Sequence, residues 1–386
     1  MLKRVVGIIV ILVLGLACST NEVETQKEKI VPTTTLVPTT TLVPTTTLVP
    51  TTILVPTTIL VPTTTTTSVS STTSTTSTSA PPSLPNGRPE LTGLDAPDPE
   101  IVISGDTYFL FATNGWSGKG FYNVPVWKSS NLESWDWAGD ALPKVGSWAQ
   151  GLFTWAPGVL ETETGWVLYY TARVKGTTED PAFPAGEQCI GVATSDKPQG
   201  PYVDRNDEPF ICQHSLGGSI DPSPFVDRDG KFWLLWKSDT NAPHVQGEVK
   251  IFSQEVSRNG TSLIGEPKAI FGANVTGSNI IENPDMLYFR DDLYLVFSAG
   301  WWEDETYYIG AAACDSVQSD CVLADFDAGS GTYLNKPVVG PGGASVIDNG
   351  QETLVIFHLW IGGTAGNGGT RKAVVITVEE LVKLAN

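Results

Sequence analysis

Five short stretches of the chain share one pattern of hydrophobic and polar positions. In each, a turn residue is followed by alternating aromatic and aliphatic residues, and the stretches begin at Asp106, Gly165, Gly230, Asp292 and Glu352. Short alternation of this kind predicts β-strands. A second short strand precedes each stretch and a third usually follows it, so the whole pattern is an internal repeat.

The repeat recurs about every 60 residues, which is long enough for a four-stranded antiparallel sheet with its loops. Sheets that are repeated radially in this way form a β-propeller. A β-sandwich is the alternative, but it would show shorter and more even spacing. We therefore expect residues 85–386 to form one all-β domain, a five-bladed β-propeller.

The first 18 residues differ from the repeat region and predict a signal peptide. Two cations precede an apolar run that ends at Ala17 and is shorter than the about 20 residues a membrane-spanning helix needs. Ala17-Cys18 resembles a bacterial lipoprotein cleavage site, which implies lipidation of Cys18. An ordinary signal peptide with an incidental cysteine is the alternative.

Residues 19–84 form a low-complexity linker that is rich in Thr, Pro and Ser. A hexamer of the form Val-Pro-Thr-Thr-Thr/Ile-Leu begins at Val31 and recurs at Val37, Val43, Val49 and Val55. Proline at every sixth residue blocks helices and interior strands, and the low-complexity segment cannot bury a core. We expect a disordered, extended stalk.

Charge and cysteine content fit an exported protein. The chain has 23 Lys and Arg against 42 Asp and Glu, so it lacks the basic face that a nucleic-acid partner requires. Besides Cys18 there are four cysteines, and their proximity in sequence suggests the disulfides Cys189–Cys212 and Cys314–Cys321. We expect an extracytoplasmic monomer, either secreted or a cell-surface lipoprotein whose only membrane contact is its lipid anchor.

Carboxylates occupy what reads as the same position in three repeats, just before the first strand. Asp98 and Asp221 each precede a proline, and Glu282 is followed by Asn283-Pro284. In a propeller these segments converge at one end of the central channel. A single Asp-Pro is usually a turn, and clustered carboxylates are also used by calcium sites. Recurrence in three repeats favours an active site, and glycoside hydrolysis requires two such carboxyl groups.

The segments around these residues resemble glycoside hydrolase family 43, and the resemblance covers residues 85–386. It rests on residues 95–101, 155–157, 191–195, 200–201, 219–230, 282–284 and 294–298. The resemblance implies a five-bladed propeller that hydrolyses arabinose- or xylose-containing polysaccharides with inversion.

Carried over by position, the resemblance implies a role for each carboxylate. Asp98 is the general base, Glu282 is the general acid, and Asp221 tunes the pKa of Glu282 and orients it. Two departures bear on the shape of the substrate subsites. Many family members have Gly-Pro-Gly-His before the fifth blade, where this chain ends the motif in Gly343, and Gly is commoner at the position of Asn283.

The resemblance also brings in one possible metal ligand. His358 matches a histidine that faces a central metal, usually calcium, in several arabinan-degrading members, and a hydrogen-bonded core histidine is the alternative. No cofactor is required, and a structural calcium in the central channel is the possible exception. Trp155 and Trp301 are candidates for stacking on a sugar ring. Trp155 lies one blade on from Asp98 at the channel end, and two adjacent tryptophans (301 and 302) cannot both point inward from one strand. A core position is the alternative for Trp155.

We expect a glycosidase that cleaves O-glycosidic bonds in a pentose-containing polysaccharide or oligosaccharide, such as arabinan, arabinoxylan or xylan side chains. Two other functions stay open. One is a catalytically silent cell-surface propeller that only binds carbohydrate, which would have no need of a proton-transfer pair. The other is a structural or adhesive surface protein, which leaves the converging carboxylates unexplained.

Overall fold

The computed structural model describes residues 90–384, apart from 118–119, 178–185, 244, 246, 329–330, 334–335 and 362–368. The expected signal peptide, Cys18 and the Thr/Pro-rich stalk lie outside the described residues. Within the described part of the chain, no helix is long and apolar enough to cross a membrane.

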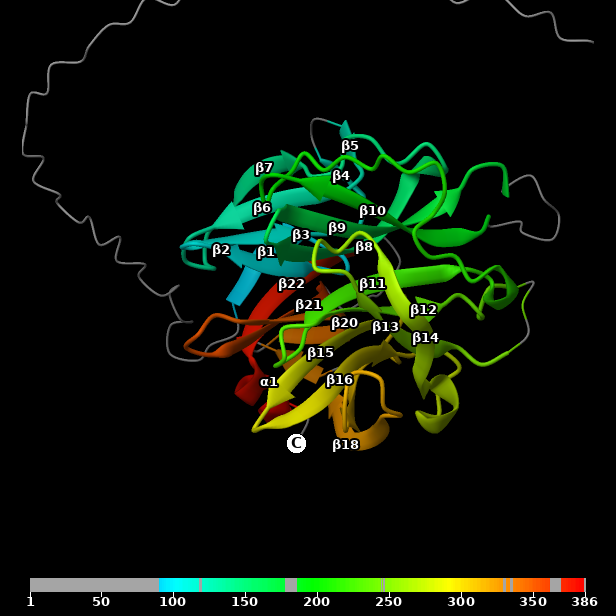
Figure 1. The fold of residues 1–386 in the computed structure, drawn as a ribbon. Coiled ribbons are helices and arrows are strands. Elements are labelled where there is room, and N and C mark those ends of the chain that lie inside the picture. The colour runs from blue at the N-terminus through cyan, green and yellow to red at the C-terminus, as the bar shows by residue number, and fades with distance from the viewer. Residues whose placement is uncertain are drawn as a thin grey trace, which may run out of the picture. The chain divides into compact units, whose positions relative to one another are not determined.

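Five consecutive β-sheets form the blades of a β-propeller, which confirms the predicted fold (Figure 1). The first blade has the strand order β2-β3-β6-β7 and the second has β8-β9-β10, with a small β4-β5 hairpin inserted after β3. The strands of this half are β2 (Glu100–Ser104), β3 (Thr107–Phe111), β4 (Gly115–Ser117), β5 (Gly120–Tyr122), β6 (Pro125–Ser129), β7 (Asp136–Asp140), β8 (Ala149–Thr162), β9 (Gly165–Val174) and β10 (Gln188–Ser195).

The third and fourth blades have four strands each, in the orders β11-β12-β13-β14 and β15-β16-β17-β18. Their strands are β11 (Ser219–Val226), β12 (Phe232–Ser238), β13 (Lys250–Val256), β14 (Leu263–Gly272), β15 (Ile281–Phe289), β16 (Asp292–Ala299), β17 (Tyr308–Cys314) and β18 (Val322–Ala328). Two single-turn 3₁₀ helices, His214–Leu216 and Ala273–Val275, precede β11 and β15.

The fifth blade contains strands from both ends of the propeller. Its order is β1-β22-β21-β20-β19. The elements are β1 (Glu90–Asp95), β19 (Gly331–Tyr333), β20 (Lys336–Asp348), β21 (Thr353–Ile361), β22 (Thr370–Thr377) and the final helix α1 (Val378–Leu384). Because β1 pairs antiparallel with β22, the chain closes the ring with its first described strand (Figure 1).

Two blades depart from the predicted four strands. The second blade has three strands, and isolated bridges from Ile190 to Ile211 and from Thr194 to Val203 follow its outer edge in place of a fourth. The fifth blade has five strands because β1 joins it, and the alternating pattern gave no signal for that closure.

Five buried clusters fill the five junctions between neighbouring blades. Strand β3 shows how the alternation produces them. Phe109 and Phe111 point into the junction with the second blade, and Tyr108 and Leu110 point into the junction with the fifth. Both faces of such a strand are buried, so successive positions are all apolar, and burying each large side chain contributes about 1.5–3 kcal/mol.

Both expected cysteine pairs are bonded in the structure. Cys189 in β10 is joined to Cys212, and Cys314 at the end of β17 is joined to Cys321. Each bridge closes a short loop at the outer part of its blade and restricts the unfolded chain.

Candidate active site

Each blade has a residue with a positive φ at an equivalent point, in or just before the strands β2, β8, β11, β15 and β20. These residues are Asp98 (47°), Ala156 (41°), Asp221 (56°), Asn283 (46°) and Gly343 (61°). In the last four blades the strand pairing also shifts register at this point, as at a β-bulge. A left-handed conformation costs a residue other than glycine roughly 1–2 kcal/mol, so the surrounding fold must hold these residues in place.

This backbone repeat corrects one sequence expectation. The position equivalent to Asp98 and Asp221 in the fourth blade is Asn283, because Asn283 has the positive φ and directly precedes a proline. Glu282 lies one residue earlier. The three carboxylates therefore meet in one place, but they do not occupy the same repeat position, and Glu282 reaches the site from a different backbone point. The positive φ of Asn283 also accounts for the preference for glycine there.

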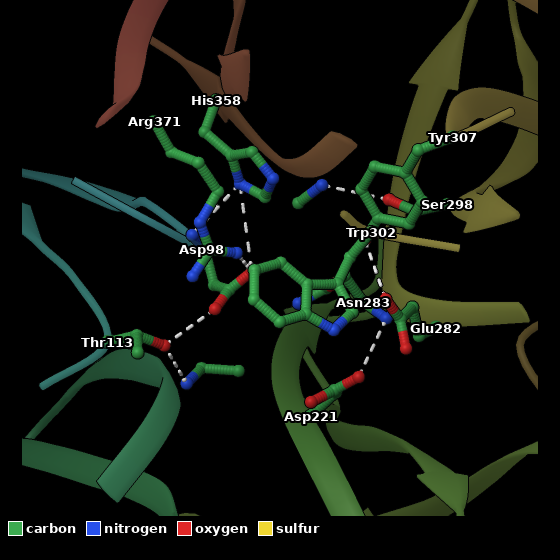
Figure 2. Close-up of polar contacts among 12 residues, drawn as sticks. Asp98, Thr113, Asp221, Glu282, Asn283, Ser298, Trp302, Tyr307, His358 and Arg371 are labelled. Carbon is green, nitrogen blue, oxygen red and sulfur yellow. Dashed lines mark hydrogen bonds and ion pairs between the residues drawn. The ribbon is translucent and has the colours of Figure 1, made fainter. Parts of the chain in front are cut away.

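The three carboxylates line one cavity of about 430 Å³ at the end of the channel. Figure 2 shows them together with Thr113, Tyr307, His358 and Arg371, which contact two of them. Trp155, Trp301 and Trp302 line the same cavity. The structure thus brings together Asp98, Asp221 and Glu282, together with both tryptophans predicted from the sequence.

Asp98 is held by contacts from the first and fifth blades. Its Oδ2 accepts a hydrogen bond from the Thr113 hydroxyl at 2.6 Å, and Arg371 places a guanidinium nitrogen 3.6 Å from Oδ1. Its backbone N–H donates to Nδ1 of His358 at 3.0 Å. A cation and a hydroxyl donor beside the carboxylate suit a group that must be negatively charged when it acts.

Glu282 has a donor on each carboxyl oxygen. The Tyr307 hydroxyl donates to Oε1 at 2.8 Å, and Nζ of Lys237 donates to Oε2 at 3.2 Å. The Lys237 side chain is only 1 % exposed, so this ion pair is buried on the lysine side. The two contacts fix the position of the carboxyl group.

Asp221 lies next to this pair and contacts the backbone rather than the Glu282 carboxyl. Its Oδ2 accepts a hydrogen bond from the N–H of Asn283 at 3.1 Å. Burial raises the pKa of Asp221 to about 7, against the opposing effect of Lys237 and with the support of the negative charges of Glu282 and Asp98. Asp221 can therefore orient Glu282 through the adjacent peptide and hold a proton near neutral pH.

His358 does not fit as a direct calcium ligand in this arrangement. Burial lowers its pKa well below the usual value, so the imidazole is neutral. Nδ1 accepts the Asp98 N–H, and the ring hydrogen must then lie on Nε2, which has no hydrogen-bond partner among the described residues. Neither nitrogen offers a free lone pair, and calcium prefers oxygen ligands. The geometry gives His358 a role in positioning Asp98.

The second group of possible ligands within the described residues does not form a metal site either. Glu187, Cys212 and His214 lie close together, but the sulfur of Cys212 is bonded to Cys189. Since a disulfide sulfur is not a thiolate, it is not available as a metal ligand.

The tryptophans divide between the rim and the wall of the cavity. Trp301 is 46 % exposed, as expected for one of two adjacent tryptophans, and Trp155 is half-buried. Trp302 stacks on Trp360 with ring centroids 6.0 Å apart, and the Arg371 guanidinium lies 4.7 Å from the Trp302 ring. Trp302 lines the same cavity as the three carboxylates, which makes it a further sugar-stacking candidate.

Sequence reasoning missed five residues that contact the carboxylates or line the cavity beside them: Thr113, Lys237, Trp302, Tyr307 and Arg371. Thr113 lies just after β3 and Lys237 lies near the end of β12, which is the equivalent strand of another blade, so an alignment of the repeats marks both positions. Tyr307 lies just before β17 and Arg371 lies at the start of β22, and the repeated strand pattern marked neither of them.

Gly343 lies where a side chain has no room, which fits the departure seen in the sequence. A Cβ there would lie 2.7 Å from Nδ1 of His358 and 3.0 Å from the Asp98 Cα. We predict that Gly343→Ala displaces His358 and Asp98 and lowers kcat/KM at least tenfold, since small misplacements near the chemistry have large effects. Gly350→Ala is a control, because its Cβ would meet nothing within 4 Å. Equal activity of both variants would contradict this prediction.

A second layer of carboxyl groups lies beneath the cavity and joins the blades. Glu100 of the first blade accepts hydrogen bonds from the Val159 N–H at 3.0 Å and the Ser345 hydroxyl at 2.7 Å. Asp285 of the fourth blade accepts from the Ser223 hydroxyl at 3.2 Å and the Val346 N–H at 2.7 Å. These two side chains therefore link blade pairs 1–2, 1–5, 3–4 and 4–5.

This second layer predicts a pH-dependent stability. Burial raises the pKa of Glu100 to about 8 and that of Asp285 to about 7. Because both values lie above those of the unfolded chain, the free energy of unfolding should fall as pH rises from about 4.5 to 8, by at most about 1.4 kcal/mol per pH unit and group. Glu100→Gln imitates the protonated acid, so its stability relative to wild type should rise across this range in chemical denaturation. Parallel curves would contradict the prediction.

Comparison with known proteins gives consistent matches across this domain. The family model described as glycosyl hydrolases family 43 matches residues 89–379. A β-D-galactofuranosidase (xynD) of Aspergillus niger is 27% identical over 70% of this chain and 76% of its own length. An extracellular exo-α-(1→5)-L-arabinofuranosidase (ArbA) of Cellvibrio japonicus is 25% identical over 69% and 79%.

Solved structures agree on the fold. A thermostable family-43 glycoside hydrolase superimposes with a TM-score of 0.59 at 22% identity, covering 74% of this chain and 90% of the other. An endo-arabinase from Bacteroides thetaiotaomicron gives a TM-score of 0.55 at 21% identity, covering 75% and 97%.

Proposed function

Since this chain belongs to glycosyl hydrolase family 43 and is a glycosidase that hydrolyses O-glycosyl bonds, we propose that it cleaves arabinan- or xylan-type polysaccharides with inversion. The observation that supports this most is the pairing of Asp98 with Arg371 and Thr113 on one side of a cavity and of Glu282 with Tyr307 and Lys237 on the other. We take Asp98 as the base and Glu282 as the acid, because Asp221, whose pKa is raised to about 7, keeps a proton beside Glu282 and not beside Asp98.

The proposed reaction uses the two groups in opposite protonation states. Asp98 removes a proton from a water molecule as that water attacks the anomeric carbon. Glu282 donates its proton to the glycosidic oxygen as the bond breaks. Asp98 ends protonated and Glu282 ends ionised, and proton exchange with solvent restores both. Asp221, with its pKa near neutrality, keeps a proton next to Glu282.

The relatives suggest the range of substrates to test. Arabinofuranosidase, endo-arabinanase and xylosidase names occur among them, and the galactofuranosidase of A. niger adds a second furanose. We place pentose-containing polymers first, and β-D-galactofuranosides second because of that relative.

The first test is hydrolysis by the wild-type protein of arabinan, arabinoxylan, xylan and aryl glycosides of arabinofuranose, xylose and galactofuranose. Proton NMR of the first product should show the anomeric configuration opposite to that of the substrate. Release with retained configuration would contradict the assignment of Asp98 as base. Binding of glycans by the folded protein without sugar release would favour the carbohydrate-binding alternative.

We also propose that the enzyme acts outside the cytoplasm. Its two disulfides suit an oxidising compartment, and two relatives are named extracellular. Lipidation of Cys18, the monomeric state and a channel calcium stay predictions from the sequence.

A further inference from the structure

The blades share a second repeated position, at the end of the strand that follows the first strand. It is occupied by Thr113, Thr171, Lys237, Ser298 and His358, all of them buried. In four blades this side chain accepts a hydrogen bond from the backbone N–H of the positive-φ residue in the next blade. The donors are Ala156 to Thr113 (2.8 Å), Asp221 to Thr171 (3.0 Å), Gly343 to Ser298 (2.8 Å) and Asp98 to His358 (3.0 Å).

The third blade breaks this pattern. Its residue is Lys237, and an ammonium group has three donors and no acceptor. The N–H of Asn283 in the next blade therefore cannot use it and donates to Oδ2 of Asp221 at 3.1 Å. The lysine instead donates to Oε2 of Glu282 at 3.2 Å. A single exchange in the repeat thus creates two of the contacts at the acid half of the site, beside the Tyr307 hydrogen bond to Glu282.

We propose that Lys237 is a positioning residue for the general acid, which holds the Glu282 carboxyl in place and sets the pH at which the Asp221–Glu282 pair loses its proton. This inference deepens the proposed function and rests on it. A buried lysine that served only as packing would destabilise the fold, because no ion pair would offset the desolvation of its charge. Lys237 instead faces carboxylates from three elements.

The charges around Lys237 support this role. Asp221 from β11, Glu282 from β15 and Asp239 after β12 all face it; burial alone would lower its pKa, but their negative charges raise it above the usual value. Lys237 is therefore a cation throughout the working pH range. Arg371 is the other cation at the site and lies beside Asp98. Loss of the Lys237 charge leaves Asp221 and Glu282 without an adjacent cation, which raises the pKa of the pair.

The test compares two neutral variants with a charged one. Lys237→Thr restores the side chain type used by the other blades, and Lys237→Met keeps the length of the stem. Lys237→Arg keeps the charge. Lys231→Met is the matched control. Lys231 lies just before β12 at the surface, and the variant removes its ion pair with Glu255, in which Nζ and Oε2 are 3.0 Å apart.

We expect the alkaline limb of the kcat/KM profile to move upward by about one pH unit or more in both neutral variants, with a lower kcat on polysaccharide. Lys237→Arg should keep the wild-type limb, as should Lys231→Met. A role in packing alone would change stability and leave the limb in place, which would overturn the proposal.

A second measurement is independent of activity. In the neutral variants the acidic pair keeps its proton in the folded state to a higher pH, whereas the unfolded carboxyls titrate near 4. The deficit in Tm relative to wild type should therefore grow between pH 5 and pH 8. When Asp221→Asn is combined with Lys237→Met and compared with Asp221→Asn alone, this growth should be smaller. A deficit that does not change with pH overturns the proposal, even if the wild type cleaves none of the tested glycans and the proposed function itself fails.

Discussion

Asp98→Asn is expected to abolish hydrolysis of every substrate, with kcat/KM falling by about 10³–10⁴-fold. Asparagine fits the same space and can accept the Thr113 hydroxyl hydrogen bond, but it cannot take a proton from the attacking water. The base acts on water and not on the leaving group, so the loss should be the same for polysaccharides and for aryl glycosides with acidic leaving groups. Initial rates on both substrate classes measure it.

The control for this variant is Asp106→Asn, at an exposed position in the hairpin between β2 and β3. It should retain wild-type rates. Circular dichroism should show that both proteins are folded. Substantial activity of Asp98→Asn on any substrate would contradict the role of Asp98 as general base and require another residue to activate the water.

Glu282→Gln is expected to lose activity in a way that depends on the leaving group. On polysaccharide, where the leaving sugar must be protonated, kcat should fall by about 10²–10⁴-fold. On an aryl glycoside whose phenol has a low pKa, the loss should be close to tenfold or less, because that group departs without a proton. A Brønsted plot of log kcat against the leaving-group pKa should therefore be steeper for the variant than for wild type.

Glutamine is the better replacement here because the carboxyl group is paired with the buried Lys237. Its amide oxygen can still accept from Lys237, and the Tyr307 hydroxyl can accept from the amide nitrogen. Glu282→Ala would leave the buried ammonium group without its partner and is expected to be destabilised as well as inactive. Equal losses of Glu282→Gln on both substrate classes would contradict the general-acid role.

The strand pattern was sufficient to predict the blades, because alternate residues of each central strand bury into two different junctions. It did not predict β1. A strand that is added to the edge of the last blade needs only backbone partners, and the sequence before Asp98 carries no aromatic alternation to reveal it. The three strands of the second blade were also not predictable, since a loop that follows the edge as isolated bridges reads like a fourth strand.

The location of the carboxylates was predictable, but the exact register of Glu282 was not. Proline after Asp98 and Asp221 marks the positive-φ residue in those blades, and Asn283-Pro284 marks the same point in the fourth. If the repeats are aligned on the proline instead of on the carboxylate, Asn283 matches Asp98 and Asp221, and Glu282 lies one residue before that position. The same comparison of repeats also picks out Lys237 among two threonines, a serine and a histidine. Trp302 and Arg371 became visible only in the structure, because their contact joins segments far apart in sequence.

Because β1 pairs with β22, the fifth blade joins the two ends of the propeller chain and closes the ring of sheets. Strand β1 pairs with β22, whose Arg371 reaches Asp98, and its last residue, Asp95, accepts the Arg371 N–H. Only two residues separate the end of β1 from Asp98. If the pairing of β1 with β22 is lost, Asp98 and Arg371 separate while the other four blades can stay folded. A boundary drawn for truncation must therefore lie before Glu90, and new chain ends are better introduced by circular permutation in a hairpin far from this blade.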